Sequence, residues 1–150
     1  MTDTAQSAQQ ELARRLSAPF PSEAYKSFTK EWTNKRGELK SVGPFTYVED
    51  EAVMQRLDDV FGPEGWSLRV EPINDHCAKV AIEVVGVVRE DFGYVTNADS
   101  PEPFKEAVSD GIRRVGRMFG IARDVYEGKV APGGVRTPAK IGRASCRERV

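Results

Sequence analysis

The sequence predicts an α+β fold: an antiparallel β-sheet (a β-β-β-α core) covered by a long C-terminal helix, with an early basic β-hairpin. The periodicity gives the order helix, hairpin, helix, hairpin, helix. Residues 80–88 form a near-continuous apolar run, which is typical of a central strand. The segment Phe104–Gly120 gathers its apolar side chains in an arc of roughly 100°, the width of a helix stripe that faces a core.

The first half of the chain predicts a short helix followed by a hairpin. Residues 6–17 have a helical period and are stopped by Pro19 and Pro21. The β-rich run 25–32, the turn sequence 34–37 and a returning strand 39–48 then predict two antiparallel strands. The open edges of such a small sheet invite pairing with another copy, so we expect a homo-oligomer.

The second half predicts a helix, a second hairpin and the long helix. Glu49 or Asp50 can cap a helix that runs to about Phe61. Strands 66–73 and 77–90 then surround a turn at 74–76, and residues 90–97 form a loop that leads to a helix starting near Pro103. The shorter helix buries Val53, Met54, Leu57 and Val60, and the long helix buries Phe104, Val108, Gly111, Val115, Met118, Phe119 and Ala122.

Composition predicts one soluble domain in a reducing cytoplasm, associated with the nucleoid if it binds DNA. The chain has 150 residues, no apolar run of about 18 residues and a polar start without a signal pattern, so we expect no membrane partner. Its two cysteines, Cys77 and Cys146, and its single histidine, His76, are too few for a disulfide framework or a zinc site. We therefore expect no metal and no cofactor.

Charge is distributed unevenly along the chain. The net charge is −1, but residues 136–150 carry +4 (five cations, one acid), so residues 1–135 carry −5. This balance argues mildly against a nucleic-acid binder. Residues 26–40 nevertheless have five cations against two acids, and residues 49–64 have six acids against one cation. Such segments can steer an anion into a groove or complement a neighbouring subunit.

The polar face of the long helix carries three arginines. Arg113, Arg114 and Arg117 lie within about one and a half turns and repel one another unless carboxylates or an anionic partner hold them. Asp110 stands three residues before Arg113 and four before Arg114. The spacing alone is typical of a solvated face with internal ion pairs, and it also suits an anion site.

Four sequence blocks resemble the Rad-fifty-two family of single-strand annealing proteins, including its bacterial and phage members. They occur in the order and spacing of that family. The blocks are Leu16-Ser-Ala-Pro-Phe-Pro21, the segment Tyr47–Trp66, Val87-Val-Arg-Glu-Asp-Phe-Gly-Tyr94 and the segment Lys105–Gly120 with its Ala-Val-Ser-Asp-Gly sequence. The resemblance spans residues 16 to about 127.

The resemblance implies a β-β-β-α core that assembles side by side into a ring or open multimer, with single-stranded DNA in a basic groove. The family's groove-helix contacts fall on Arg113, Arg114 and Arg117. The family also has a basic residue on the first strand of the early hairpin, at a position that corresponds in spacing to Phe28 here. Lys26 or Lys30, two residues to either side on the same face, could substitute for it. Further DNA-binding candidates are Tyr47, which could instead pack on the helix that follows it, and the hairpin-tip residues Lys35 and Arg36, where cations are usually only solvated.

Residues 1–130 are therefore expected to form a single-strand annealing domain, and residues 131–150 a linker and a tail that resembles vector read-through. The chain has no phosphate-binding loop for ATP, so annealing of complementary strands in recombination and repair should need no nucleotide. A single-strand binding protein and a recombinase are further candidate partners.

Two rival functions stay open at this point. One is a metal-dependent nuclease that uses the carboxylates of 49–51 or 90–91, although acids at a helix start are more often caps. The other is a protein-binding scaffold whose acidic helix face, Asp58 and Asp59, docks a basic partner. We expect no catalytic residue and no enzyme.

Overall fold

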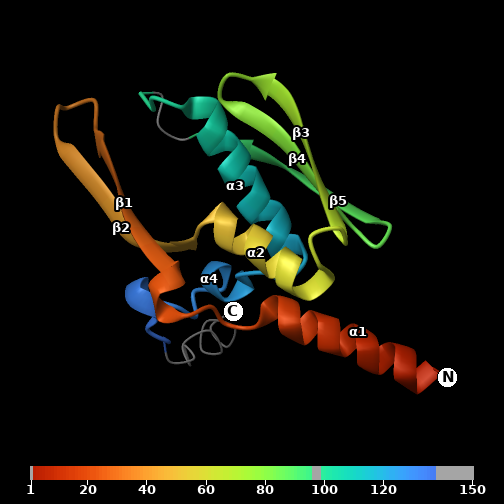
Figure 1. Cartoon of the computed structure of the whole chain (residues 1–150). Coiled ribbons are helices and arrows are strands. Elements are labelled where there is room, and N and C mark those ends of the chain that lie inside the picture. Colours follow the sequence, from red (N-terminus) through yellow and green to blue (C-terminus); the bar gives the residue numbers. More distant parts are fainter. Residues whose placement is uncertain (1, 96–98, 138–150) are drawn as a thin grey trace, which may run out of the picture. The chain divides into compact units, whose positions relative to one another are not determined.

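The computed structural model describes residues 2–95 and 99–137, and these form an α+β protein with antiparallel sheets (Figure 1). The chain divides into two compact units. The first unit contains the residues up to Phe20 and Val48–Arg123. The second unit contains Pro21–Tyr47 and the described residues that follow Arg123. The assignment of residues 1–130 to one annealing domain stays a prediction, and the predicted tail lies mostly outside the described residues.

The sheet of the first unit is a three-stranded meander. Strands β3 (Trp66–Asn74), β4 (Cys77–Val84) and β5 (Val87–Tyr94) pair antiparallel, with β4 in the centre. Helix α3 (Pro103–Met118) packs on one face of this sheet, against β4 and β5 (Figure 1). Alternate residues of β4 are buried beneath it, as period-two alternation requires: Ala78, Val80, Ile82 and Val84.

The prediction of one long arm over residues 77–90 was wrong, because the chain turns within it. Val84 pairs with Val87, so Val85 and Gly86 form a two-residue hairpin loop. Both have positive φ, 48° and 79°, as a type I′ turn requires. Val85 is a β-branched residue that rarely adopts this conformation, so only Gly86 signalled the turn. The residues predicted as a loop after Glu90 instead continue β5 to Tyr94.

The buried face of α3 is rotated from the predicted stripe. Gly111 and Val115 are buried as predicted, but Val108, Met118 and Phe119 are only half-buried and Phe104 is 36% exposed. Ala107 and Ile112 are buried instead, and the buried Ala122 lies beyond the end of α3. A glycine of the sheet determines this rotation of α3 about its axis, which we call its phase. A side chain on Gly93 of β5 would clash with the backbone of α3 at Ala107 and Gly111. The helix can therefore lie close to the sheet. It is also not the last element, since α4 (Arg123–Tyr126) and a short 3₁₀ turn, η2 (Pro132–Gly134), follow.

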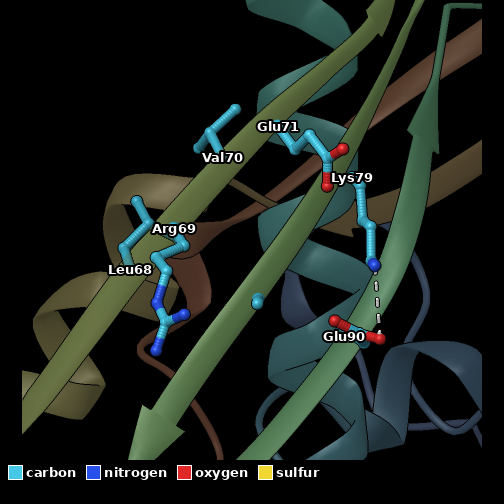
Figure 2. Close-up of a pocket in the computed structure, with 7 residues that line it drawn as sticks. Leu68, Arg69, Val70, Glu71, Lys79 and Glu90 are labelled. Atoms are coloured by element: carbon cyan, nitrogen blue, oxygen red, sulfur yellow. Dashed lines mark ion pairs between the residues drawn. The ribbon is translucent and has the colours of Figure 1, made fainter.

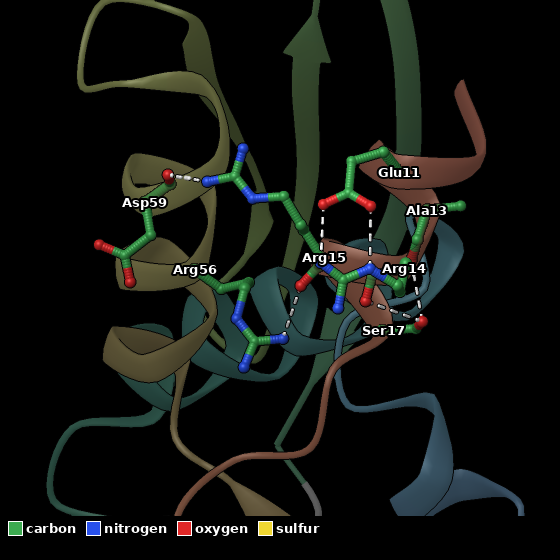
Figure 3. A network of polar contacts seen from close by, with 7 residues as sticks. All are labelled: Glu11, Ala13, Arg14, Arg15, Ser17, Arg56 and Asp59. Atoms are coloured by element: carbon green, nitrogen blue, oxygen red, sulfur yellow. Dashed lines mark hydrogen bonds and ion pairs between the residues drawn. The ribbon is translucent and has the colours of Figure 1, made fainter. Parts of the chain in front are cut away.

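Helices α1 (Thr2–Ser17) and α2 (Asp50–Phe61) complete the first unit, and α1 begins four residues before the predicted start. Val53 and Leu57 of α2 are fully buried, while Met54 and Val60 are half-buried. Near the end of α1, Arg14 donates two hydrogen bonds to Glu11, at 2.7 and 2.9 Å, and so holds the pKa of that carboxyl below its usual value (Figure 3).

The second unit is built on the predicted early hairpin. Strands β1 (Tyr25–Thr33) and β2 (Leu39–Val48) form a two-stranded sheet, preceded by a short 3₁₀ turn, η1 (Ser22–Ala24). The side chain of Asn34 closes the turn by accepting the Arg36 and Glu38 N–H groups, at 2.9 Å each. At the base of the hairpin, the buried Tyr25 donates a hydrogen bond to Asp124 at 3.0 Å.

Candidate nucleic-acid interface

The arginines of α3 are arranged around Asp110. Arg114 Nε donates a hydrogen bond to Asp110 Oδ2 at 2.7 Å, and a guanidinium nitrogen of Arg113 lies 3.8 Å from Oδ1. The same Oδ2 accepts the backbone N–H of Tyr94, at the end of β5, at 3.0 Å. Asp110 is therefore fixed by the sheet as well as by its helix, so it orients the guanidiniums. Residues 110–117 keep a formal charge of +2.

Two basic residues near the C-terminal end of α3 were missed by the sequence reasoning. Arg123 donates hydrogen bonds to the carbonyls of Arg117 and Met118, at 3.0 and 3.4 Å, and so caps the helix end. The guanidinium carbon of Arg89, on β5, lies 5.6 Å from the ring centre of Phe119. The spacing of Arg123 after the predicted helix end could have indicated a cap, but Arg89 gave no local signal.

The remaining predicted site residues lie on the hairpin, in the second unit. Lys26, Lys30 and the tip residues Lys35 and Arg36 are all exposed. Tyr47 is half-buried, and its ring contacts another ring of the hairpin. The structure thus groups the predicted residues into two sets, the arginines of α3 in the first unit and the lysines, Arg36 and Tyr47 in the second. Their role in DNA binding stays a prediction.

An aromatic cluster on the hairpin joins the predicted site residue Tyr47 to two rings that were not predicted as part of the site. The ring centre of Phe28 lies 5.3 Å from that of Phe45 and 5.7 Å from that of Tyr47, the latter pair edge-to-face. Phe28 and Phe45 are nevertheless 50% and 41% exposed. Tyr47 therefore packs against a ring of its own hairpin. The alternation of lysine and aromatic residues in β1 was the signal that could have located this cluster.

The face of the first unit's sheet away from α3 has a different character. A depression there is lined by residues of β3, β4 and β5 that carry both charges, and Lys79 Nζ lies 3.5 Å from Glu90 Oε1 (Figure 2). Arg69 lies 3.8 Å from Glu83 across the strands. The cations of this face have acidic neighbours on the same sheet. We therefore expect this face to attract a phosphate backbone less strongly than the arginine face of α3 does.

Three of the carboxylates considered for a nuclease or a docking face have structural partners. Asp50 accepts a hydrogen bond from Ser109 Oγ at 3.0 Å, which joins α2 to α3, and Asp58 accepts the Trp66 indole N–H at 2.7 Å. Asp59 accepts the Gln55 side-chain amide at 2.9 Å. Among residues 2–95 and 99–137, no three His, Cys, Asp or Glu side chains come together as metal ligands.

Across the same described ranges, no helix is long and apolar enough to span a bilayer. The fold and the site define an α+β protein in which a helix with a cationic outer face covers an antiparallel meander, accompanied by a hairpin that carries lysines and aromatic rings. The chain belongs to the Rad52/22 family of double-strand break repair proteins, whose family model matches residues 8–132. This membership confirms the resemblance seen in the sequence.

Two curated relatives are similar over most of the chain. The single-stranded DNA-binding protein DdrA of Deinococcus radiodurans is 32% identical over 122 residues, which are 78% of this chain and 55% of the relative. DdrA of Deinococcus deserti is 32% identical over 120 residues, which are 78% of this chain and 57% of the relative. The chain thus spans little more than half the length of these relatives.

Proposed function

We propose that this protein binds single-stranded DNA and anneals complementary strands without ATP, as an oligomer with a basic groove, in recombination and repair. The observation that carries the proposal is the arginine face of α3, where Asp110 holds Arg113 and Arg114 on a helix that is itself fixed to the sheet. Membership of a double-strand break repair family and similarity to DNA-binding relatives support it.

Annealing fits this inventory on physical grounds. Guanidiniums bind phosphates in a way that depends strongly on salt and weakly on sequence. Binding through the backbone keeps a strand extended with its base edges accessible, and the cations reduce the repulsion between two strands. None of these steps breaks a covalent bond, so the protein needs no catalytic group and is not proposed as an enzyme.

The test is annealing of two labelled complementary oligonucleotides, in EDTA and without nucleotide. We expect the wild type to accelerate annealing and the Arg113→Ala/Arg117→Ala variant to lose at least about tenfold in single-strand affinity, since each lost phosphate contact weakens binding. The matched control, Arg14→Ala/Arg69→Ala, removes the same charge from two exposed arginines of the first unit and should anneal like the wild type.

If Arg113→Ala/Arg117→Ala binds and anneals single strands as well as the wild type does, the assignment of α3 as the DNA-binding helix is refuted. Shortening of the oligonucleotides, abolished by EDTA, would instead support the nuclease alternative.

A further inference from the structure

The two faces of strand β1 differ in chemistry. Side chains alternate along a strand, so one face carries Lys26, Phe28, Lys30 and Trp32 in that order. The opposite face carries Ser27, Thr29, Glu31 and Thr33. Phe28 and Trp32 are 50% and 45% exposed although their rings are apolar. Cations thus alternate with exposed aromatic rings on one face only.

Strand β2 extends the same face. Phe45 contributes a ring beside Phe28, and Tyr47 meets Phe28 edge-to-face. Pairing of rings across strands stabilises a hairpin, which explains why these three lie together. It does not explain why about half of the Trp32 side chain is exposed near the tip, or why both neighbours of Phe28 on this face are lysines.

We propose that this lysine-aromatic face of the hairpin binds single-stranded DNA by stacking: Phe28 and Trp32 stack on bases while Lys26 and Lys30 contact the adjacent phosphates. The inference rests on the proposed function and deepens it, because it adds recognition of the bases to recognition of the backbone. Four residues along a strand separate the two rings by roughly 13 Å, so each ring meets a different base.

Stacking of this kind is compatible with annealing. An aromatic ring covers the flat face of a base and leaves its hydrogen-bonding edge open to a complementary strand. Every base has such a face, so the contact tolerates any sequence. A site of this type would hold a strand while it is searched for complementarity.

The charge of the face decides between DNA and a second copy of the chain as its occupant. Of the residues assigned to this face above, Lys26 and Lys30 are cationic and none is acidic, and both lysines are exposed. A polyanion complements these lysines, whereas two copies of the face packed together would bring like charges close.

The experiment compares binding of labelled oligo-dT with binding of an abasic oligomer of the same length, which has the backbone without bases. For the Phe28→Leu/Trp32→Leu variant, we expect a loss of at least about fivefold in affinity for oligo-dT and unchanged affinity for the abasic strand, because stacking is lost and phosphate contact is not. Thr29→Ala/Thr33→Ala, on the opposite face of β1, is the matched control and should bind both strands like the wild type.

Two further variants complete the design. Lys26→Ala/Lys30→Ala should weaken binding of both strands, because it removes phosphate contacts. Trp32→Leu alone leaves the ring cluster of Phe28 intact, so it tests the proposal even if the double aromatic variant loses its hairpin. Oligo-dT should quench tryptophan fluorescence in the wild type, and this quenching should be absent from Trp32→Leu.

The outcomes separate the two proposals. A wild type that binds neither strand refutes the proposed function and the inference with it. A wild type that binds DNA but does not prefer oligo-dT to the abasic strand, or aromatic variants with unchanged affinity, overturns the inference alone. An equal loss for both strands with a smaller assembly in sedimentation also overturns it, and assigns the face to contact between copies.

Discussion

Arg56 joins helices α1 and α2, and its replacement by alanine tests how the first unit is held together. One of its guanidinium nitrogens lies 2.7 Å from the carbonyl oxygen of Ala18, 2.9 Å from that of Leu16 and 3.2 Å from that of Arg15. These carbonyls lie at and just beyond the end of α1, where backbone acceptors lack partners in their own helix. Figure 3 shows Arg56 of α2 reaching toward the end of α1.

The expected cost follows from these contacts. A hydrogen bond to a charged group contributes about 1.5–3 kcal/mol, and the three acceptors share one nitrogen, so we count the two shorter bonds at the low end, about 3 kcal/mol. The guanidinium also lies 4.0 Å from the ring centre of Phe20, a contact of about 0.5–1 kcal/mol. Arg56→Ala should therefore lower the free energy of unfolding by about 3–4 kcal/mol, a large part of a typical total of about 5–15 kcal/mol.

The measurement is urea unfolding together with limited proteolysis of the segment that follows α1. We expect Arg56→Ala to lower the urea midpoint and to make this segment a cleavage site. Arg56→Lys should fall between alanine and the wild type, because an ammonium lacks the planar set of donors. Arg14→Ala, which removes an arginine bonded to the exposed Glu11, is the control and should unfold like the wild type. If Arg56→Ala lowers the free energy of unfolding by less than about 0.5 kcal/mol, the proposed role of Arg56 in joining α1 to α2 is refuted.

Three further substitutions test other contacts. Gly93→Ala should lower the free energy of unfolding by about 3 kcal/mol or more in urea, because its methyl group meets the backbone of α3, and a variant as stable as the wild type would show that the helix can move away. Asp110→Asn raises the formal charge by one but should weaken single-strand binding in fluorescence anisotropy, since Arg114 loses the partner that orients it; tighter binding would mean that Asp110 competes with DNA. Tyr25→Phe should cost about 1 kcal/mol in thermal unfolding by removing the hydrogen bond to Asp124, and no change would show that this bond adds nothing.

Local periodicity was enough to predict much of the fold. The near-continuous apolar run over residues 80–88 predicted a central strand, and β4, which holds its first part, is central and buried on alternate residues. The stripe of α2 predicted the burial of Val53 and Leu57. The turn at Asn34 predicted the early hairpin, which the structure contains. In each case, the signal lies within a few residues, because period and turn chemistry are properties of a short segment.

The candidate site was predicted in part. The spacing of Asp110, Arg113 and Arg114 predicted their ion pairs, since residues three and four apart are neighbours on a helix. The attachment of Asp110 to Tyr94 could not be predicted, because sixteen residues separate them in sequence and only strand β5 brings them together.

The sequence by itself therefore determined the fold class, most of the helices and strands, the arginine face of α3 and, through its sequence blocks, the family. Only the tertiary structure decided the turn at Val85, where an exposed valine adopts positive φ, and the phase of α3, which the close approach of Gly93 sets. It also gave Arg56 its place at the end of α1. The turn at Val85 lies within one hairpin, but its first residue is of a type that rarely adopts positive φ. The phase of α3 and the place of Arg56 depend on contacts between segments distant in the chain, and no local pattern records which backbone a residue will meet after folding.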